Sequence, residues 1–161
     1  MSLIIFNLFI STPLKSVEIK GKLNNYLNYR LKTRSLSVFN KYYELFYKEK
    51  TLIEGKSKYI KIVPINISDY MNPIVLAYLI MSDGNYDKSR NRIRIYTNSF
   101  TKQEVEILAE SIKFKLGIYV GVLHDRKDQW ILTIGAKQLE LLRKLVLPYF
   151  EKSMLYRIGL S

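Results

Sequence analysis

Hydrophobic residues recur along the chain with two different periods, and each period predicts one kind of element. Apolar and polar residues alternate in 28–35 and 91–97, so successive side chains face opposite sides and both segments are predicted to be strands. Residues 36–48 change to helical spacing, and 58–64 is predicted to be another strand that Pro64 ends. The chain therefore combines helices with short strands.

A strongly apolar helix is predicted at 73–83. Asn72 precedes it and can cap its first turn. Pro73 suits the first helical position because its missing N–H would be unpaired there anyway. Gly84 is expected to end the helix directly after Asp83.

The sequence after this helix predicts further elements of both kinds, and it leaves room for a short strand within 85–91 as well. These elements are, in order, a helix that opens with the capping box of Thr101 and Glu104 and stops at Gly117, strands at 118–124 and 129–135, and a helix at 137–150 that Pro148 breaks. Helices that cover one face of an antiparallel sheet make an α+β fold.

The order of elements suggests one and a half copies of a repeat. Strand, helix and strand at 28–64 resemble the second part of the longer unit that follows, without its opening helix. We therefore expect an irregular N-terminal segment at 1–25, a partial first repeat at 26–68 and a complete domain at 69–161.

Charge narrows the class of partner. Lys and Arg number 26 against 14 acidic residues, a formal net charge of +12, which favours DNA or RNA because each neutralised phosphate releases counterions. Two predicted strands present cations and one tyrosine on alternate positions. The candidate nucleic-acid-binding residues of these strands are Arg30, Lys32, Arg34, Arg92, Arg94 and Tyr96. A solvated outer face or an acidic protein partner is the alternative reading.

Composition excludes several kinds of chemistry. The chain has no cysteine and a single histidine, His124, so disulfides, zinc fingers, multi-histidine metal sites and HNH-type nuclease sites are excluded. The opening apolar run is too short to span a bilayer, which needs roughly 20 apolar residues, and we expect no membrane association and no targeting signal. Heavy use of Ile, Lys, Asn and Tyr suggests an AT-rich coding genome, such as an organelle's.

Asp83 is the candidate for metal chemistry. The C-terminal end of a helix carries partial negative charge, so a carboxylate there is electrostatically misplaced unless a cation binds beside it. Mg²⁺ held by carboxylates against a phosphodiester would supply such a cation. A plain Asp-Gly turn is the alternative interpretation.

The sequence LAYLIMSDG at 76–84 resembles the motif that names the LAGLIDADG homing endonucleases. Three other segments occur in the same order as in the two-repeat subfamily found in mitochondrial introns, and the resemblance spans roughly residues 28 to 158. These segments are KTRSLSVFNKYYELFY, IYTNSFTKQEVEIL and LVLPYFEKSMLYRI.

The resemblance implies an αββαββα unit with a basic, saddle-shaped antiparallel sheet that grips DNA. It implies that motif helices pack against one another, with Ala77 and Ile80 at that interface. It also implies that Asp83 is the catalytic, Mg²⁺-binding acid, and that Lys127 lies near the catalytic centre with Arg126 on the nucleic acid.

The chain departs from the family in having one motif where cleavage of two strands uses two motif acids. We therefore expect a nucleic-acid-binding protein that does not cleave alone. A second chain or a copy of this one could supply the missing acid, making a split or homodimeric Mg²⁺-dependent endonuclease. The remaining alternative is an RNA-binding maturase or a structural component of an organellar ribonucleoprotein such as the mitochondrial ribosome. The expected location is a mitochondrion or another organelle.

Overall fold

The computed structural model describes the backbone of residues 10–20, 25–51 and 57–160, and side chains at residues 32, 34–51 and 57–160. The chain forms two compact units, 1–44 and 45–161, with the boundary inside the expected partial repeat. Within the described part, no helix is long and apolar enough to cross a membrane.

The first unit is built on a two-stranded antiparallel ribbon. Strand β1 (Ile10–Lys20) pairs with β2 (Asn25–Thr33), and a helix, α2 (Asn40–Phe46), crosses the unit boundary. The prediction that 1–25 is irregular was therefore wrong for β1. The pairing register of β1 shifts twice between Ile10 and Lys15, and Pro13 lies there without a backbone N–H to donate. This irregularity interrupts the alternation that would have revealed the strand.

The second unit begins with a hairpin and continues as a single αββαββα layer structure. The hairpin consists of β3 (Tyr47–Thr51), which the sequence did not predict, and β4 (Ser57–Lys61). The layer structure consists of α3 (Pro73–Asp83), β5 (Gly84–Asp87), β6 (Arg92–Tyr96), α4 (Lys102–Leu116), β7 (Gly121–Arg126), β8 (Gln129–Ile134) and α5 (Leu139–Val146). The α+β fold is confirmed, as is the extra strand suspected within 85–91.

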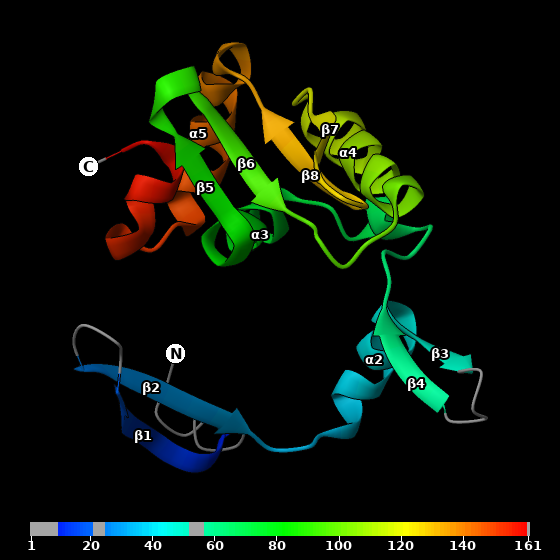
Figure 1. Cartoon of the computed structure of the whole chain (residues 1–161), viewed down its shortest axis with the longest axis vertical. Helices are drawn as coiled ribbons and strands as arrows, with labels where there is room; N and C mark the ends of the chain where they lie inside the picture. Colours follow the sequence, from blue (N-terminus) through cyan, green and yellow to red (C-terminus); the bar gives the residue numbers. More distant parts are fainter. Residues whose placement is uncertain (1–9, 21–24, 52–56, 161) are drawn as a thin grey trace. The chain divides into compact units, whose positions relative to one another are not determined.

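The four strands form one antiparallel sheet in the order β5-β6-β8-β7, and α3, α4 and α5 lie on one side of it (Figure 1). The helices bury the inward side chains of the sheet in an apolar core. Fully buried members of this core are Leu76, Ala77, Ile80, Ile93, Ile95, Val105, Ile112, Leu132, Ile134, Leu142 and Val146. Because burial of each large aliphatic side chain contributes about 1.5–3 kcal/mol, this core fixes which face of the sheet stays outward.

Helix α3 begins as predicted and ends for a different reason. The Asn72 side chain accepts a hydrogen bond from the Val75 N–H at 3.0 Å, and Pro73 occupies the first turn. Gly84 has φ −85° and starts β5 at once, so it is no left-handed cap. A Cβ at Gly84 would lie 2.5 Å from the Ile80 carbonyl oxygen, and glycine is therefore required by close approach.

The predicted capping box of α4 is confirmed, and it also anchors the preceding loop. Glu104 accepts a hydrogen bond from the Thr101 N–H at 2.7 Å and another from the Val63 N–H at 3.2 Å. The Thr101 hydroxyl in turn accepts from the Glu104 N–H at 3.3 Å. One carboxylate thus satisfies two backbone donors, one of which lies 41 residues away from it in sequence.

We expect Glu104→Ala to destabilise the protein more than Thr101→Ala. Loss of an N-cap side chain costs about 1 kcal/mol. Glu104→Ala leaves the N–H groups of Thr101 and Val63 without their hydrogen-bond acceptor and should lower the free energy of unfolding by about 2 kcal/mol. Urea unfolding of both variants measures the difference. Glu106→Ala, which removes an exposed carboxylate 3.5 Å from Lys102 Nζ, is the control and should cost about 0.3 kcal/mol. Equal costs for the Thr101 and Glu104 variants would contradict the anchoring role.

Candidate nucleic-acid interface and motif-helix foot

The outer face of the four-stranded sheet carries the cations of β6. Ile93 and Ile95 are fully buried, so alternation turns Arg92, Arg94 and Tyr96 to the opposite, outer face. All three of these outward residues are half-buried. The structure therefore confirms the placement of these residues on one face, and their contact with nucleic acid stays a prediction.

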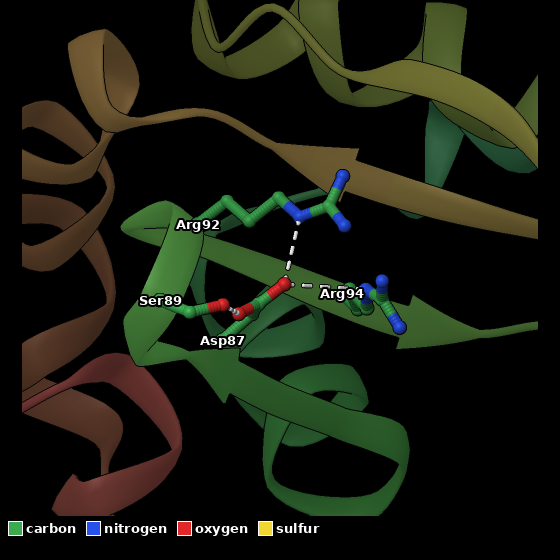
Figure 2. Close-up of polar contacts among 4 residues, drawn as sticks. All are labelled: Asp87, Ser89, Arg92 and Arg94. Carbon is green, nitrogen blue, oxygen red and sulfur yellow. Dashed lines mark hydrogen bonds and ion pairs between the residues drawn. The ribbon is translucent and has the colours of Figure 1, made fainter.

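Asp87, the last residue of the edge strand β5, also lies on this outer face and was missed by the sequence analysis. It lies directly across from Arg92 in the strand pairing. Asp87 Oδ2 is 3.1 Å from Arg92 Nε and 3.7 Å from Arg94 Nε, while the Ser89 hydroxyl donates to Asp87 Oδ1 at 2.7 Å (Figure 2). Three side chains thus converge on one carboxylate.

The environment of Asp87 keeps it ionised. The hydrogen bond from Ser89, followed by the one from Arg92, lowers the pKa of Asp87 from 3.8 to about 2. The carboxylate is consequently charged at any pH used to measure binding. The outer face is therefore less basic than the alternation of arginines suggested, because Asp87 offsets part of their charge.

The strand next to β6 adds polar groups with unmet hydrogen bonds. Thr133 of β8 pairs with Arg94 in the sheet register, and Ile131 pairs with Tyr96. Thr133 Oγ1 and Gln129 Oε1 of this strand are buried atoms without a hydrogen-bond partner among the described residues. Buried polar groups are normally satisfied, so this part of the outer face resembles a surface that another molecule completes.

Asp83 is exposed at the C-terminal end of α3, here called the foot of the helix, where the motif predicted it. The Ser82 hydroxyl donates to Asp83 Oδ2 at 3.1 Å and also to the Tyr78 carbonyl oxygen at 3.0 Å. Among the described residues, no group of three or more His, Cys, Asp or Glu side chains could hold a metal ion. Mg²⁺ keeps several waters and is usually bound by one or two carboxylates together with substrate phosphates. Asp83 could supply one such carboxylate, and the described residues offer no acidic cluster that would complete the site.

Arg157 is the basic residue at this foot, and the sequence analysis did not find it. It belongs to a 3₁₀ helix, η6 (Lys152–Ile158), and its Nη1 donates a hydrogen bond to the Gly84 carbonyl oxygen. The contact joins residues 73 positions apart. No local sequence signal marks it, because it depends on how η6 folds back onto β5.

Lys127, predicted near the catalytic centre, lies in the β7–β8 turn with φ +48°. The position of Lys127 between the last two strands of the sheet agrees with the prediction. Its place near the catalytic centre stays a prediction. The adjacent Arg126 is exposed and forms an ion pair with Asp125 at 3.4 Å.

The predicted nucleic-acid-binding residues Arg30, Lys32 and Arg34 belong to the first unit, 1–44. Lys32 and Arg34 are exposed, and the backbone of Arg30 lies in β2 opposite Lys15. The side chain of Arg30 lies outside the described residues. Contact of these three residues with nucleic acid stays a prediction.

Ala77 and Ile80, predicted at an interface with a second motif helix, are instead fully buried in the domain's own core. The sheet and the other helices pack on that side of α3, leaving a different side exposed. The exposed large side chains of α3 are Ile74, Val75 and Tyr78, and Tyr78 is 65% exposed. A second helix would therefore have to contact Tyr78 and its neighbours.

A groove adjoins this exposed face. It has a volume of about 490 Å³ and lies between α3 and the segment that follows α5. Tyr78, Met81 and Ser82 line one side, and Pro148 and Tyr149 line the other. Among the described residues of the second unit, this side of the motif helix has no packing partner, and it is apolar and slightly hollowed.

Comparison with known proteins agrees with this architecture. The sequence model of the LAGLIDADG DNA endonuclease family matches residues 3–142. The chain belongs to the LAGLIDADG DNA endonuclease family. This membership confirms the resemblance to the LAGLIDADG homing endonucleases that was based on the motif and the three ordered segments.

Relatives within the LAGLIDADG family are named as endonucleases and maturases. The chain is 31% identical to the intron-encoded endonuclease ai4 of Dictyostelium discoideum, over 86% of this chain and 82% of that protein. It is 30% identical to the cytochrome b mRNA maturase bI2 of Saccharomyces cerevisiae, over 87% of this chain but 32% of that protein. A probable intron-encoded endonuclease of Wickerhamomyces canadensis is 29% identical, with 65% of its length covered.

A solved structure of a homing endonuclease is also similar to this chain. The structure of the homing endonuclease I-WcaI bound to its DNA recognition sequence superposes with a TM-score of 0.79 and 25% identity, covering 99% of this chain and 69% of that one. The likeness extends over both units of the chain.

Proposed function

We propose that this chain is one part of a DNA-cleaving assembly, which binds DNA through the outer face of its four-stranded sheet and cuts only when a second motif acid joins Asp83. The observation that carries the proposal is the exposed Asp83 carboxylate at the foot of a helix whose outward face is apolar. Contiguous exposed apolar surface marks interaction sites. Another helix on this face would bring its own foot beside Asp83.

The side chain of Tyr78 favours a different helix over a copy of this one. Residues near the axis of a twofold pair contact their own copies. Tyr78 is 65% exposed and central on the free face of α3, so two copies would hold the helices apart. A partner helix with a small residue opposite Tyr78 can approach closely. We therefore assign the second acid to another polypeptide or another part of the same protein.

The net charge of +12, and the two arginines and one tyrosine on the outer face of the sheet, support a nucleic acid of either kind. DNA is favoured over RNA because the solved relative I-WcaI is bound to DNA. The names of the relatives place several of them in introns. An intron of a mitochondrial or other organellar genome is accordingly the proposed origin of this chain.

Replacing both Arg92 and Arg94 by alanine is expected to weaken DNA binding at 100 mM salt by at least about tenfold. Each lost phosphate contact should flatten the slope of log K against log salt by roughly one unit. Each lost base contact should make the free energy of binding less favourable by about 1–3 kcal/mol. Fluorescence anisotropy with a randomised duplex pool, at several salt concentrations, measures both quantities.

The matched control removes the same charge from the opposite side of the sheet. Lys113 and Lys115 lie in the last turn of α4, which covers the inner face. Their double alanine variant should leave the salt slope within experimental error. If the α4 variant and the Arg92/Arg94 variant weaken binding equally, the sheet face is not the binding surface.

RNA binding in the manner of a maturase is the second candidate. The observation that favours it is the 30% identity to a cytochrome b mRNA maturase. Competition between structured intron RNA and duplex DNA for the same protein separates the two candidates. Preferential binding of RNA that survives the Arg92/Arg94 double substitution would favour this second function and a different surface.

A further inference from the structure

Two arginines of β6 share one carboxylate, and they do so through the same atom of each side chain. Asp87 Oδ2 is 3.1 Å from Arg92 Nε and 3.7 Å from Arg94 Nε. Without Asp87, two guanidinium groups this close would repel one another and separate. The carboxylate therefore keeps them side by side.

Contact through Nε leaves the terminal amino groups for another molecule. Figure 2 shows the Nη ends of both guanidinium groups directed away from Asp87. The side chains are only 14% and 28% exposed for Arg92 and Arg94, so their stems are packed and their orientation is limited. A planar guanidinium group held in this way loses little conformational entropy when it binds another molecule.

Asp87 is itself fixed in place. The Ser89 hydroxyl donates to its other oxygen at 2.7 Å, and β5 pairs with β6 so that Asn85 lies opposite Arg94. The charged groups that face the Asp87 carboxylate are the guanidinium groups of Arg92 and Arg94. Asp87 and Ser89 thus hold the guanidinium groups of Arg92 and Arg94 in place on the outer face of the sheet.

We propose that Asp87 is a specificity-determining positioning residue, which fixes Arg92 and Arg94 as a pair that reads two closely spaced guanines in the major groove. The inference rests on the proposed DNA binding. Guanine is the base whose major-groove edge offers two acceptors, N7 and O6, to a guanidinium fork. A phosphate contact needs no such bracing, because a flexible exposed cation supplies it equally well.

The spacing of the two arginines suits neighbouring base pairs. Residues two apart in a strand are about 7 Å apart, which is about two base-pair steps of 3.4 Å. Since both Nε atoms approach the same oxygen, the guanidinium groups are no more widely separated than this. Two guanines within two steps of each other are therefore the expected target feature.

The test compares the full-length wild-type chain with Asp87→Asn in selection from a pool of randomised DNA duplexes. Wild type should enrich guanines within two steps of one another. Asp87→Asn keeps the shape of the side chain and removes one negative charge beside the DNA. We expect it to bind the unselected pool more tightly, by roughly twofold to fivefold, and to lose about tenfold in guanine enrichment. Affinity and selectivity should thus change in opposite directions.

A merely structural role for Asp87 predicts a different result, in which affinity and enrichment fall together. That result, or an unchanged guanine enrichment in a folded Asp87→Asn variant, overturns the inference. If Asp87→Asn does not fold, Ser89→Ala is the variant to test, because it removes only the hydrogen bond from the Ser89 hydroxyl to Asp87. It should lower enrichment by roughly twofold to threefold, and no change in that variant overturns the inference equally.

Failure of this inference can be distinguished from failure of the proposed function. If wild type binds the pool but enriches no guanine pair, DNA binding stands and the role of Asp87 is wrong. If wild type binds no duplex at any salt concentration, both are wrong.

Discussion

Asp83→Asn is expected to abolish DNA cleavage by the reconstituted assembly while DNA binding stays within twofold of wild type. The asparagine has the shape of the aspartate and can still accept the hydrogen bond that Ser82 donates at 3.1 Å. It removes the negative charge at the foot of α3, where the described residues offer no cluster of further acidic ligands. The loss should be at least about 10³-fold, since charge stabilisation by a metal site is worth several kcal/mol.

The experiment mixes the chain with a second LAGLIDADG-motif polypeptide and measures nicking and double-strand breaks in plasmid DNA with Mg²⁺ present. Asp128→Asn is the matched control, because Asp128 is an exposed acid in the β7–β8 turn and its change removes the same charge. That control should cleave normally. Full cleavage by Asp83→Asn would refute the catalytic role of Asp83. Cleavage by this chain without the second polypeptide would refute the need for a second acid.

Gly84→Ala is expected to destabilise the protein by about 3 kcal/mol, although its backbone φ of −85° suits any residue. The added Cβ would lie 2.5 Å from the Ile80 carbonyl oxygen and 2.9 Å from the Ile80 Cα, and neither backbone atom can rotate away. Overpacking typically costs about 1–3 kcal/mol, and rigid neighbours place this substitution at the upper end. Thermal unfolding should occur roughly 10 °C lower.

Gly117→Ala provides the contrasting control. Gly117 has φ +68°, but a Cβ there would meet nothing within 4 Å. The cost is therefore conformational and should be about 1–2 kcal/mol. If Gly84→Ala is less destabilising than Gly117→Ala, the close approach of β5 to α3 is not what requires glycine at 84.

Local patterns predicted most of the elements because their signals are contained within a few residues. Alternation revealed β6, the capping box revealed the start of α4, and Asn72 with Pro73 revealed the start of α3. Strand β1 was missed because Pro13 and two register shifts break its period. Local patterns supplied the order of the elements, and the family resemblance supplied their arrangement as helices on one side of a basic antiparallel sheet.

Properties that depend on packing between elements were harder to predict. The family resemblance placed Ala77 and Ile80 at an interface between motif helices, but the domain's own core buries both. Asp87 carries a charge opposite to that expected for its face, and only the β5–β6 register reveals that Arg92 is its partner. The contact between Arg157 and Gly84 likewise depends on tertiary structure.

The two sides of α3 have consequences for how such a protein can evolve. The side containing Leu76, Ala77 and Ile80 holds the fold together, and substitutions there are costly to stability. The side containing Tyr78 and Ser82 contributes little to the domain's own core, so substitutions there are nearly neutral for folding. Partner choice can therefore drift after gene fission or duplication without loss of the folded domain.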